Sequence, residues 1–157
     1  MSTARIFTVE NQLAKLVDRP GGKTVADHVR AAEMRVQGVR DVTLASLIEK
    51  AEAMATAVTA GKNGSDPKAF DTIYDISNAI FGLAGTFGLK GLAEAAFSLC
   101  DLADSFRSGE TVNWPAIDVH VDGIRLLATL GDKAEAAGAD TILDGLRRVR
   151  ARVLPTG

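Results

Sequence analysis

The sequence predicts an all-α fold, specifically an up-down-up-down four-helix bundle with further helices at both ends. Apolar residues recur every three or four positions over long stretches, which is the helical period. Alanine, leucine and charged residues dominate, whereas tyrosine and tryptophan occur once each. Residues 112–121 form a brief strand-like stretch, but they fit a helix as well. Turn-forming glycines and prolines separate the apolar runs at short intervals, which favours consecutive helices joined by short loops.

Length, charge and cysteine content predict one cytoplasmic domain, residues 1–157. The chain is 46% apolar, and its 18 basic and 20 acidic residues give a net charge of −2. This balance argues against a nucleic-acid or anionic-membrane partner, because both require a basic surplus. A single cysteine excludes an intrachain disulfide and a cysteine-based zinc site. No apolar run approaches the roughly 20 residues of a membrane span, and we expect no metal and no cofactor.

Residues 1–42 are predicted to form an N-terminal helical extension. An amphipathic piece over residues 1–19 ends at a strong turn, Pro20-Gly21-Gly22. A second periodic run opens at Thr24 and carries valines at positions 25, 29, 36 and 39. Gly38 and the cluster at residues 41–43 then predict a break and a new helix N-cap.

Residues 43–131 are predicted to form the four-helix bundle. Asp66 and Pro67 are typical N-cap and first-turn residues, so they mark the start of the second bundle helix. Gly88 ends or kinks that helix, and Pro115 opens the fourth one. The four expected helices cover residues 44–58, 66–87, 92–106 and 115–130.

Residues 132–157 are predicted to contain one C-terminal helix, from Asp140 to about Val153. Its last turns carry arginines at positions 147, 148, 150 and 152. These cations would complement the negative end of the helix dipole, or they would contact an acidic partner surface.

The second bundle helix has an unusual polar flank. At about 100° per residue, this flank lies away from the core-facing sector. Each glycine inside a helix costs about 1 kcal/mol relative to alanine, so two on one flank require a reason. Either a neighbouring helix packs closely there, or a partner approaches the backbone around Asn78. The flank consists of Asp71, Asp75, Asn78, Gly82 and Gly85.

The run from Asn78 to Gly88 resembles the signature of histidine-containing phosphotransfer (HPt) domains of two-component phosphorelays. That signature is roughly His-x-Leu-Lys-Gly-Ser-Ala-Gly-x-Leu-Gly. Phe87 stands at the place of its second leucine, and the similarity extends over about residues 44–130. The matching small residues are Gly82, Ala84, Gly85 and Gly88.

Two departures from this signature concern the chemistry. Asn78 stands where the family has its phosphoacceptor histidine, and Phe81 replaces the lysine that helps to neutralise phosphate. An amide nitrogen has no free lone pair to accept a phosphoryl group. The resemblance therefore implies a docking module for a response-regulator receiver or a histidine kinase, without the standard transfer reaction and without catalytic residues. The expected partner-binding residues are Asp71, Asp75, Asn78, Phe81, Gly82, Gly85 and Lys90.

Two alternatives remain open at the level of sequence. Phosphotransfer through His28 or His120 would make the chain an active relay protein, although both residues lie at edges of apolar stripes. A structural or dimerising bundle would use the glycine flank as a helix–helix seam, with a homo-oligomer as the product. Asp71 and Asp75, one turn apart, either bind a cation or form a solvated acidic face.

Overall fold

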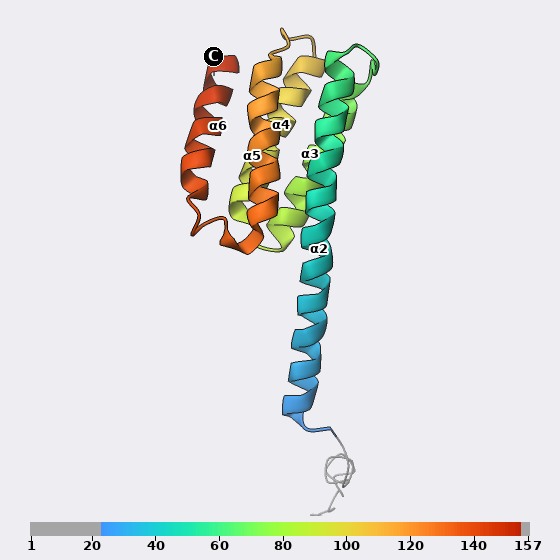
Figure 1. Cartoon of the computed structure of the whole chain (residues 1–157), viewed down its shortest axis with the longest axis vertical. Helices are drawn as coiled ribbons and strands as arrows, with labels where there is room; N and C mark the ends of the chain where they lie inside the picture. The colour runs from blue at the N-terminus through green and yellow to red at the C-terminus, as the bar shows by residue number, and fades with distance from the viewer. Residues whose placement is uncertain (1–22, 155–157) are drawn as a thin grey trace, which may run out of the picture. The chain divides into compact units, whose positions relative to one another are not determined.

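The computed structural model describes residues 23–154 and confirms an all-α fold there, without strands (Figure 1). The amphipathic piece predicted over residues 1–19 lies outside the described residues. By its internal contacts the chain divides into two units, residues 1–38 and residues 39–157. The helices are α2 (Val25–Lys62), α3 (Ala69–Thr86), α4 (Lys90–Arg107), α5 (Trp114–Leu130) and α6 (Ala139–Val153), with a short 3₁₀ turn η1 (Gly131–Lys133) before α6.

A reciprocal cap starts α2 at the position that the sequence predicts. The backbone amide of Asp27 donates to the hydroxyl of Thr24, and the amide and hydroxyl of Thr24 donate to the Asp27 carboxylate. These bonds satisfy amides that have no partner inside the first turn. They also hold the pKa of Asp27 below its usual value.

The predicted break at Gly38 and residues 41–43 is wrong, because α2 continues through it as one helix. Thr43 does not cap a new helix. Its hydroxyl donates to the carbonyl of Val39 at 2.9 Å, a bond to the preceding turn that a continuous helix allows. A single interior glycine costs about 1 kcal/mol, which the surrounding helical residues offset.

The other predicted helix boundaries hold to within a few residues. Asp66 accepts a bond from the amide of Lys68, and α3 begins at Ala69, two residues after Pro67. Gly88 ends α3 with a φ of 74°, and the next amide, of Leu89, donates back to the carbonyl of Ala84 at 2.9 Å. This left-handed end suits glycine, which has no Cβ.

Asn113 and Trp114 fix the start of α5. The side-chain oxygen of Asn113 accepts a bond from the amide of Ala116 at 3.0 Å. The indole of Trp114 stacks on Phe70 of α3 with ring centroids 5.2 Å apart. The aromatic entry that the sequence places before Pro115 thus ties α5 to α3.

One hydrophobic core unites the helices of residues 39–154. It draws on all five helices, and α4 packs against α3, α5 and α6. The core face of α2 meets α3 where Met54 and Ser77, both fully buried, touch across the interface. The largest fully buried apolar side chains are Leu47, Met54, Ile73, Ile80, Leu99, Leu102, Ile117, Ile124 and Leu127.

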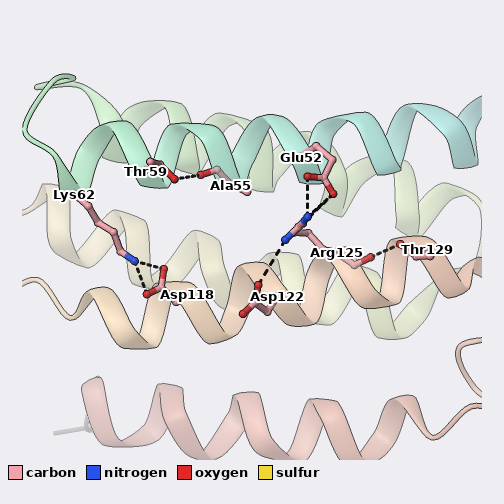
Figure 2. A network of polar contacts seen from close by, with 8 residues as sticks. All are labelled: Glu52, Ala55, Thr59, Lys62, Asp118, Asp122, Arg125 and Thr129. Carbon is pink, nitrogen blue, oxygen red and sulfur yellow. Dashed lines mark hydrogen bonds and ion pairs between the residues drawn. The ribbon is translucent and has the colours of Figure 1, made fainter.

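Ion pairs join α2 to α5 along their exposed sides (Figure 2). Lys62 binds both carboxylate oxygens of Asp118, and Arg125 makes two parallel bonds of 2.9 Å to Glu52. Arg125 also lies 3.9 Å from Asp122 on its own helix. Such exposed pairs each contribute at most about 1 kcal/mol, so they orient the helices more than they stabilise them.

Two arginines of α6 bind carboxylates of α4 in the same chain. Arg147 binds Glu94, and Arg150 binds Asp101 at 2.5 Å. Two of the four arginines that could have contacted an acidic partner are therefore already paired with carboxylates of the same chain. Within the described residues, no helix is both long and apolar enough to cross a membrane.

Candidate functional site on α3

The polar flank predicted on α3 is a continuous exposed stripe. Its residues follow one another at intervals of four, three, four and three, which keeps them on one side of the helix. Asn78 lies in the middle of this stripe and is exposed, as its helical phase predicts. The opposite side of α3 carries the buried residues Ile73, Ser77, Ile80 and Ala84. We call Asp71, Asp75, Asn78, Gly82 and Gly85 the α3 stripe.

The two glycines of the α3 stripe border open space. A Cβ atom placed on Gly82 or Gly85 would meet no other heavy atom of the described chain within 4 Å, leaving aside the adjoining backbone. The close-packing interpretation of these glycines is therefore wrong. The seam glycine is Gly61 of α2, where a Cβ would lie 2.6 Å from the Cβ of Ala69 and 2.8 Å from the Trp114 ring.

An aromatic pair borders the stripe on the side of α4. Phe81 is 41% exposed and Phe97 of α4 is 51% exposed, with ring centroids 5.5 Å apart. The sequence analysis included Phe81 and missed Phe97. At about 100° per residue, Phe97 lies on the side of α4 away from the apolar stripe of Leu92, Leu99 and Phe106, so its helical phase alone could have indicated its exposure. Its contact with Phe81 depends on how α4 packs against α3.

The N-terminal end of the stripe is acidic but partly neutralised. Asp71 lies 3.6 Å from Arg107 of α4, whose guanidinium also binds Asp104 and lies 4.4 Å above the ring of Tyr74. Asp75 is exposed one turn further along. The described chain has no group of three or more acidic, histidine or cysteine side chains arranged to hold a metal ion.

Lys90 lies beyond the other end of the stripe, as the first residue of α4. It lines a surface pocket together with the α3–α4 turn and residues of η1, including Gly131 and Asp132. On the same side, Arg40 of α2 binds Asp132 and donates to the carbonyl of Phe87 at 3.0 Å. Lys90 thus lies at the end of α3 that is about two helical turns beyond Asn78.

His120 is enclosed in the core rather than presented for chemistry. It is fully buried, and its ring nitrogens lie 2.8 Å from the carbonyl of Ala116 and 2.9 Å from the hydroxyl of Ser98. Because a carbonyl only accepts, Nδ1 carries the proton and Nε2 accepts from Ser98. Burial lowers the pKa of His120, since the charged form would lose its hydration. His28, in the other unit, is exposed.

Comparisons of the chain with protein-family models, with curated proteins and with solved structures find no match. The assignment of a function therefore depends on the geometry of α3 and α4 and on the motif that α3 carries.

Proposed function

We propose that residues 43–131 form an HPt-like four-helix bundle that docks a response-regulator receiver domain and does not relay phosphate. The partner meets the α3 stripe and the adjacent aromatic pair, Phe81 and Phe97. The chain acts as a binding module that sequesters or scaffolds a two-component protein. A histidine kinase is the alternative partner on the same surface.

The observation that carries this proposal is the open backbone at Gly82 and Gly85. Two interior glycines weaken an exposed helix by about 1 kcal/mol each, without any packing gain inside the chain. A partner that approaches the backbone supplies the missing reason for them, because any Cβ would hold its surface away. Gly82 and Gly85 follow Phe81 by one and four positions, and they lie about one and two turns from Asn78.

The aromatic pair supplies the apolar centre that such a contact requires. Interfaces derive much of their binding energy from a few large side chains near their centre, aromatic ones above all. Phe81 and Phe97 are half-exposed and in contact with each other, and Phe81 directly precedes Gly82. Where an HPt domain has a lysine for phosphate, this chain has an apolar anchor. The substitution weakens electrostatic recognition of phosphate and strengthens apolar docking.

The proposal excludes standard phosphotransfer for two reasons. Asn78 is exposed but has no nucleophilic lone pair. Both ring nitrogens of His120 are bonded inside the core, so a phosphoryl donor cannot reach them in the folded chain. Transfer to His28 is the remaining form of the relay alternative, and the experiment below tests it.

The decisive experiment restores the missing chemistry with Asn78→His and Phe81→Lys. A receiver domain that binds the wild-type chain is phosphorylated with radioactive phosphate and mixed with each variant. We expect no acid-labile label on the wild type and clear label on the double variant, because the imidazole enters a surface that already docks the receiver. Leu126→His is the matched control, because Leu126 is about as exposed as Phe81 but lies on a different helix, α5.

Three outcomes would contradict the proposal. The first is that none of the receivers from the source organism binds the wild-type chain. The second is equal labelling of the double variant and of Leu126→His, which would show unspecific transfer. The third is label on the wild-type chain that disappears in His28→Gln, which would establish the relay alternative.

A further inference from the structure

Ser98 of α4 and His120 of α5 form a hydrogen-bonded pair that the docking function does not use. The hydroxyl oxygen of Ser98 lies 2.9 Å from Nε2 of His120, and Nδ1 lies 2.8 Å from the carbonyl oxygen of Ala116. Because Nδ1 donates to that carbonyl, the lone pair of Nε2 accepts the proton of the hydroxyl. A hydroxyl, an imidazole base and a third group that orients the base are the arrangement that activates a serine nucleophile.

The two members of this pair differ in exposure. His120 is fully buried, so a ligand does not reach its ring, whereas Ser98 is partly exposed. Burial holds the pKa of His120 below its usual value, so the ring is uncharged at neutral pH and is ready to take up a proton. Ser98 therefore connects a buried base to the surface of the protein.

Ser98 lines a surface pocket of about 140 Å³ between α4 and α6. The other lining residues are Glu94, Phe97, Arg147 and Arg150. Glu94, Phe97 and Arg147 are each about half-exposed, so the pocket opens to solvent. Its volume is below the roughly 300 Å³ at which sites for drug-sized ligands begin, so the pocket suits a short acyl group.

Arg150 brings an unused hydrogen-bond donor to the lining of this pocket. Its Nη2 donates to Asp101 at 2.5 Å, but its Nε is buried and has no acceptor among the described residues. A buried donor without a partner is destabilising, so its presence requires a reason. The oxyanion that forms when a serine attacks an ester carbonyl would supply the missing acceptor.

We propose that Ser98 is the nucleophile of a site that hydrolyses short-chain acyl esters, with His120 as its base and Arg150 as the donor to the oxyanion. The Oγ of Ser98 attacks the carbonyl carbon, its proton moves to Nε2 of His120, and the carbonyl π electrons move onto the oxygen. As the carbonyl re-forms, the bond to the alcohol breaks and the departing oxygen takes the proton from Nε2. The acyl group is then bonded to Ser98.

Water completes the reaction. Its oxygen attacks the acyl carbon, one of its protons passes to Nε2 of His120, and the oxygen of Ser98 leaves and recovers that proton. One ester and one water thus give one acid and one alcohol, without oxidation or reduction. The inference is independent of the docking function of α3, although Phe97 borders both sites, because no receiver takes part in this reaction.

The first test uses a fluorophosphonate probe, whose phosphorus atom is attacked by a serine oxygen with loss of fluoride. The full-length chain is incubated with the probe, and the adducts are mapped by mass spectrometry of its peptides. We expect Ser98 to be labelled about tenfold faster or more than Ser108, an exposed serine at the C-terminal end of α4. Equal labelling of the two serines, or no adduct on Ser98, would overturn the proposal.

Hydrolysis of p-nitrophenyl acetate then tests both members of the pair. Every chain in this assay carries His28→Gln, because the exposed imidazole of His28 would itself cleave so activated an ester. We expect Ser98→Ala and His120→Gln each to lower the rate about tenfold or more, and Ser108→Ala to leave it unchanged. Circular dichroism checks that each variant is folded. A rate that Ser98→Ala or folded His120→Gln leaves unchanged would contradict the assignment.

The solvent isotope effect gives a second measurement if His120→Gln does not fold. Transfer of a proton to His120 during the attack should make hydrolysis by the His28→Gln chain about twofold slower in D₂O than in water. Equal rates in the two solvents would show that Ser98 reacts without a base, and the proposal would then fail.

Discussion

Asn78 and His120 show how accessibility and reactivity are divided between two side chains of the same unit. Asn78 occupies the phosphoacceptor position of the motif and is exposed, but its amide is chemically inert there. His120 has the reactive side chain, but the carbonyl of Ala116 and the hydroxyl of Ser98 occupy both its nitrogens. The residue at the motif position is thus accessible but inert, whereas the histidine of the same unit is buried. This separation is the residue-level basis for a docking module that does not transfer phosphate.

Burial of His120 makes the stability of the chain depend on pH. Burial lowers the pKa of His120 in the folded state below its value of about 6.5 in the unfolded chain. As the pH falls below about 6.5, the unfolded chain takes up a proton that the folded chain refuses, so the free energy of unfolding falls. The slope for one proton is at most about 1.4 kcal/mol per pH unit. Above that range His120 contributes no pH dependence.

We therefore expect His120→Gln to flatten the pH dependence of stability between about pH 7.5 and 5. Urea unfolding at several pH values measures this slope for the wild type and the variant. His28→Gln is the control, because His28 is exposed and is the only other histidine of the chain. A slope that His120→Gln leaves unchanged would show that the histidine is protonated within the fold.

A comparison of the helices shows that glycine serves different structural roles at different positions. Gly61 allows α2 to approach α3 and the Trp114 ring, and Gly88 ends α3 with a left-handed backbone. Gly82 and Gly85 do neither, because they border open space in the middle of α3. Gly38 lies inside α2 without ending it. Gly38 and Gly145 also border open space inside helices, and what sets Gly82 and Gly85 apart is that they share one exposed stripe with Asn78.

Alanine substitutions separate these roles. Gly82→Ala and Gly85→Ala should each raise the free energy of unfolding by roughly 0.5–1 kcal/mol, because alanine favours the helix and meets no neighbour. Gly61→Ala should lower it by about 1–3 kcal/mol, because its Cβ would overlap Ala69 and Trp114. Urea unfolding gives the signs. The two stabilised variants should also bind the receiver more weakly, and unimpaired binding would argue against backbone contact at the α3 stripe.

At the scale of the whole molecule, the core lies entirely in the second unit. Every buried apolar residue of the described chain falls between Leu47 and Leu146. The α3 stripe, Phe81 and Phe97 lie in the same stretch, so docking and stability depend on one unit. The described residues before position 39 contribute no buried side chain to this core.

Truncation tests this division. A fragment of residues 39–157 should unfold in one cooperative transition with a melting temperature within a few degrees of the full chain, because it keeps the complete core. It should also bind the receiver with unchanged affinity. A fragment of residues 69–157 is the matched control, and it should not fold because it lacks Leu47, Met54 and the other core residues of α2. Circular dichroism against temperature measures both, and a molten 39–157 fragment would contradict the division.

Interactions between residues that are close in sequence explain why most helix boundaries could be predicted from the sequence. The cap at Thr24, the turn at Gly88 and the entry at Pro115 depend only on residues within a few positions of each other, so they follow from the sequence. The exposure of Asn78 could also be predicted, because the helical period alone determines which residues of α3 lie opposite its buried side. The break predicted at Gly38 failed because local signals compete, and the continuing helix satisfies more backbone hydrogen bonds than a cap at residues 41–43 would.

The remaining features arise where helices meet, and no local signal encodes them. Whether a glycine borders a neighbour or open space depends on the distance between helices, which distinguishes Gly61 from Gly82. The packing of α4 against α3 brings Phe97 beside Phe81, a contact that no pattern within either helix encodes. Ser98, twenty-two positions before His120, reaches the ring only because α4 and α5 pack together. Side-chain chemistry and helical period are properties of the chain, whereas proximity between helices exists only after the core has formed.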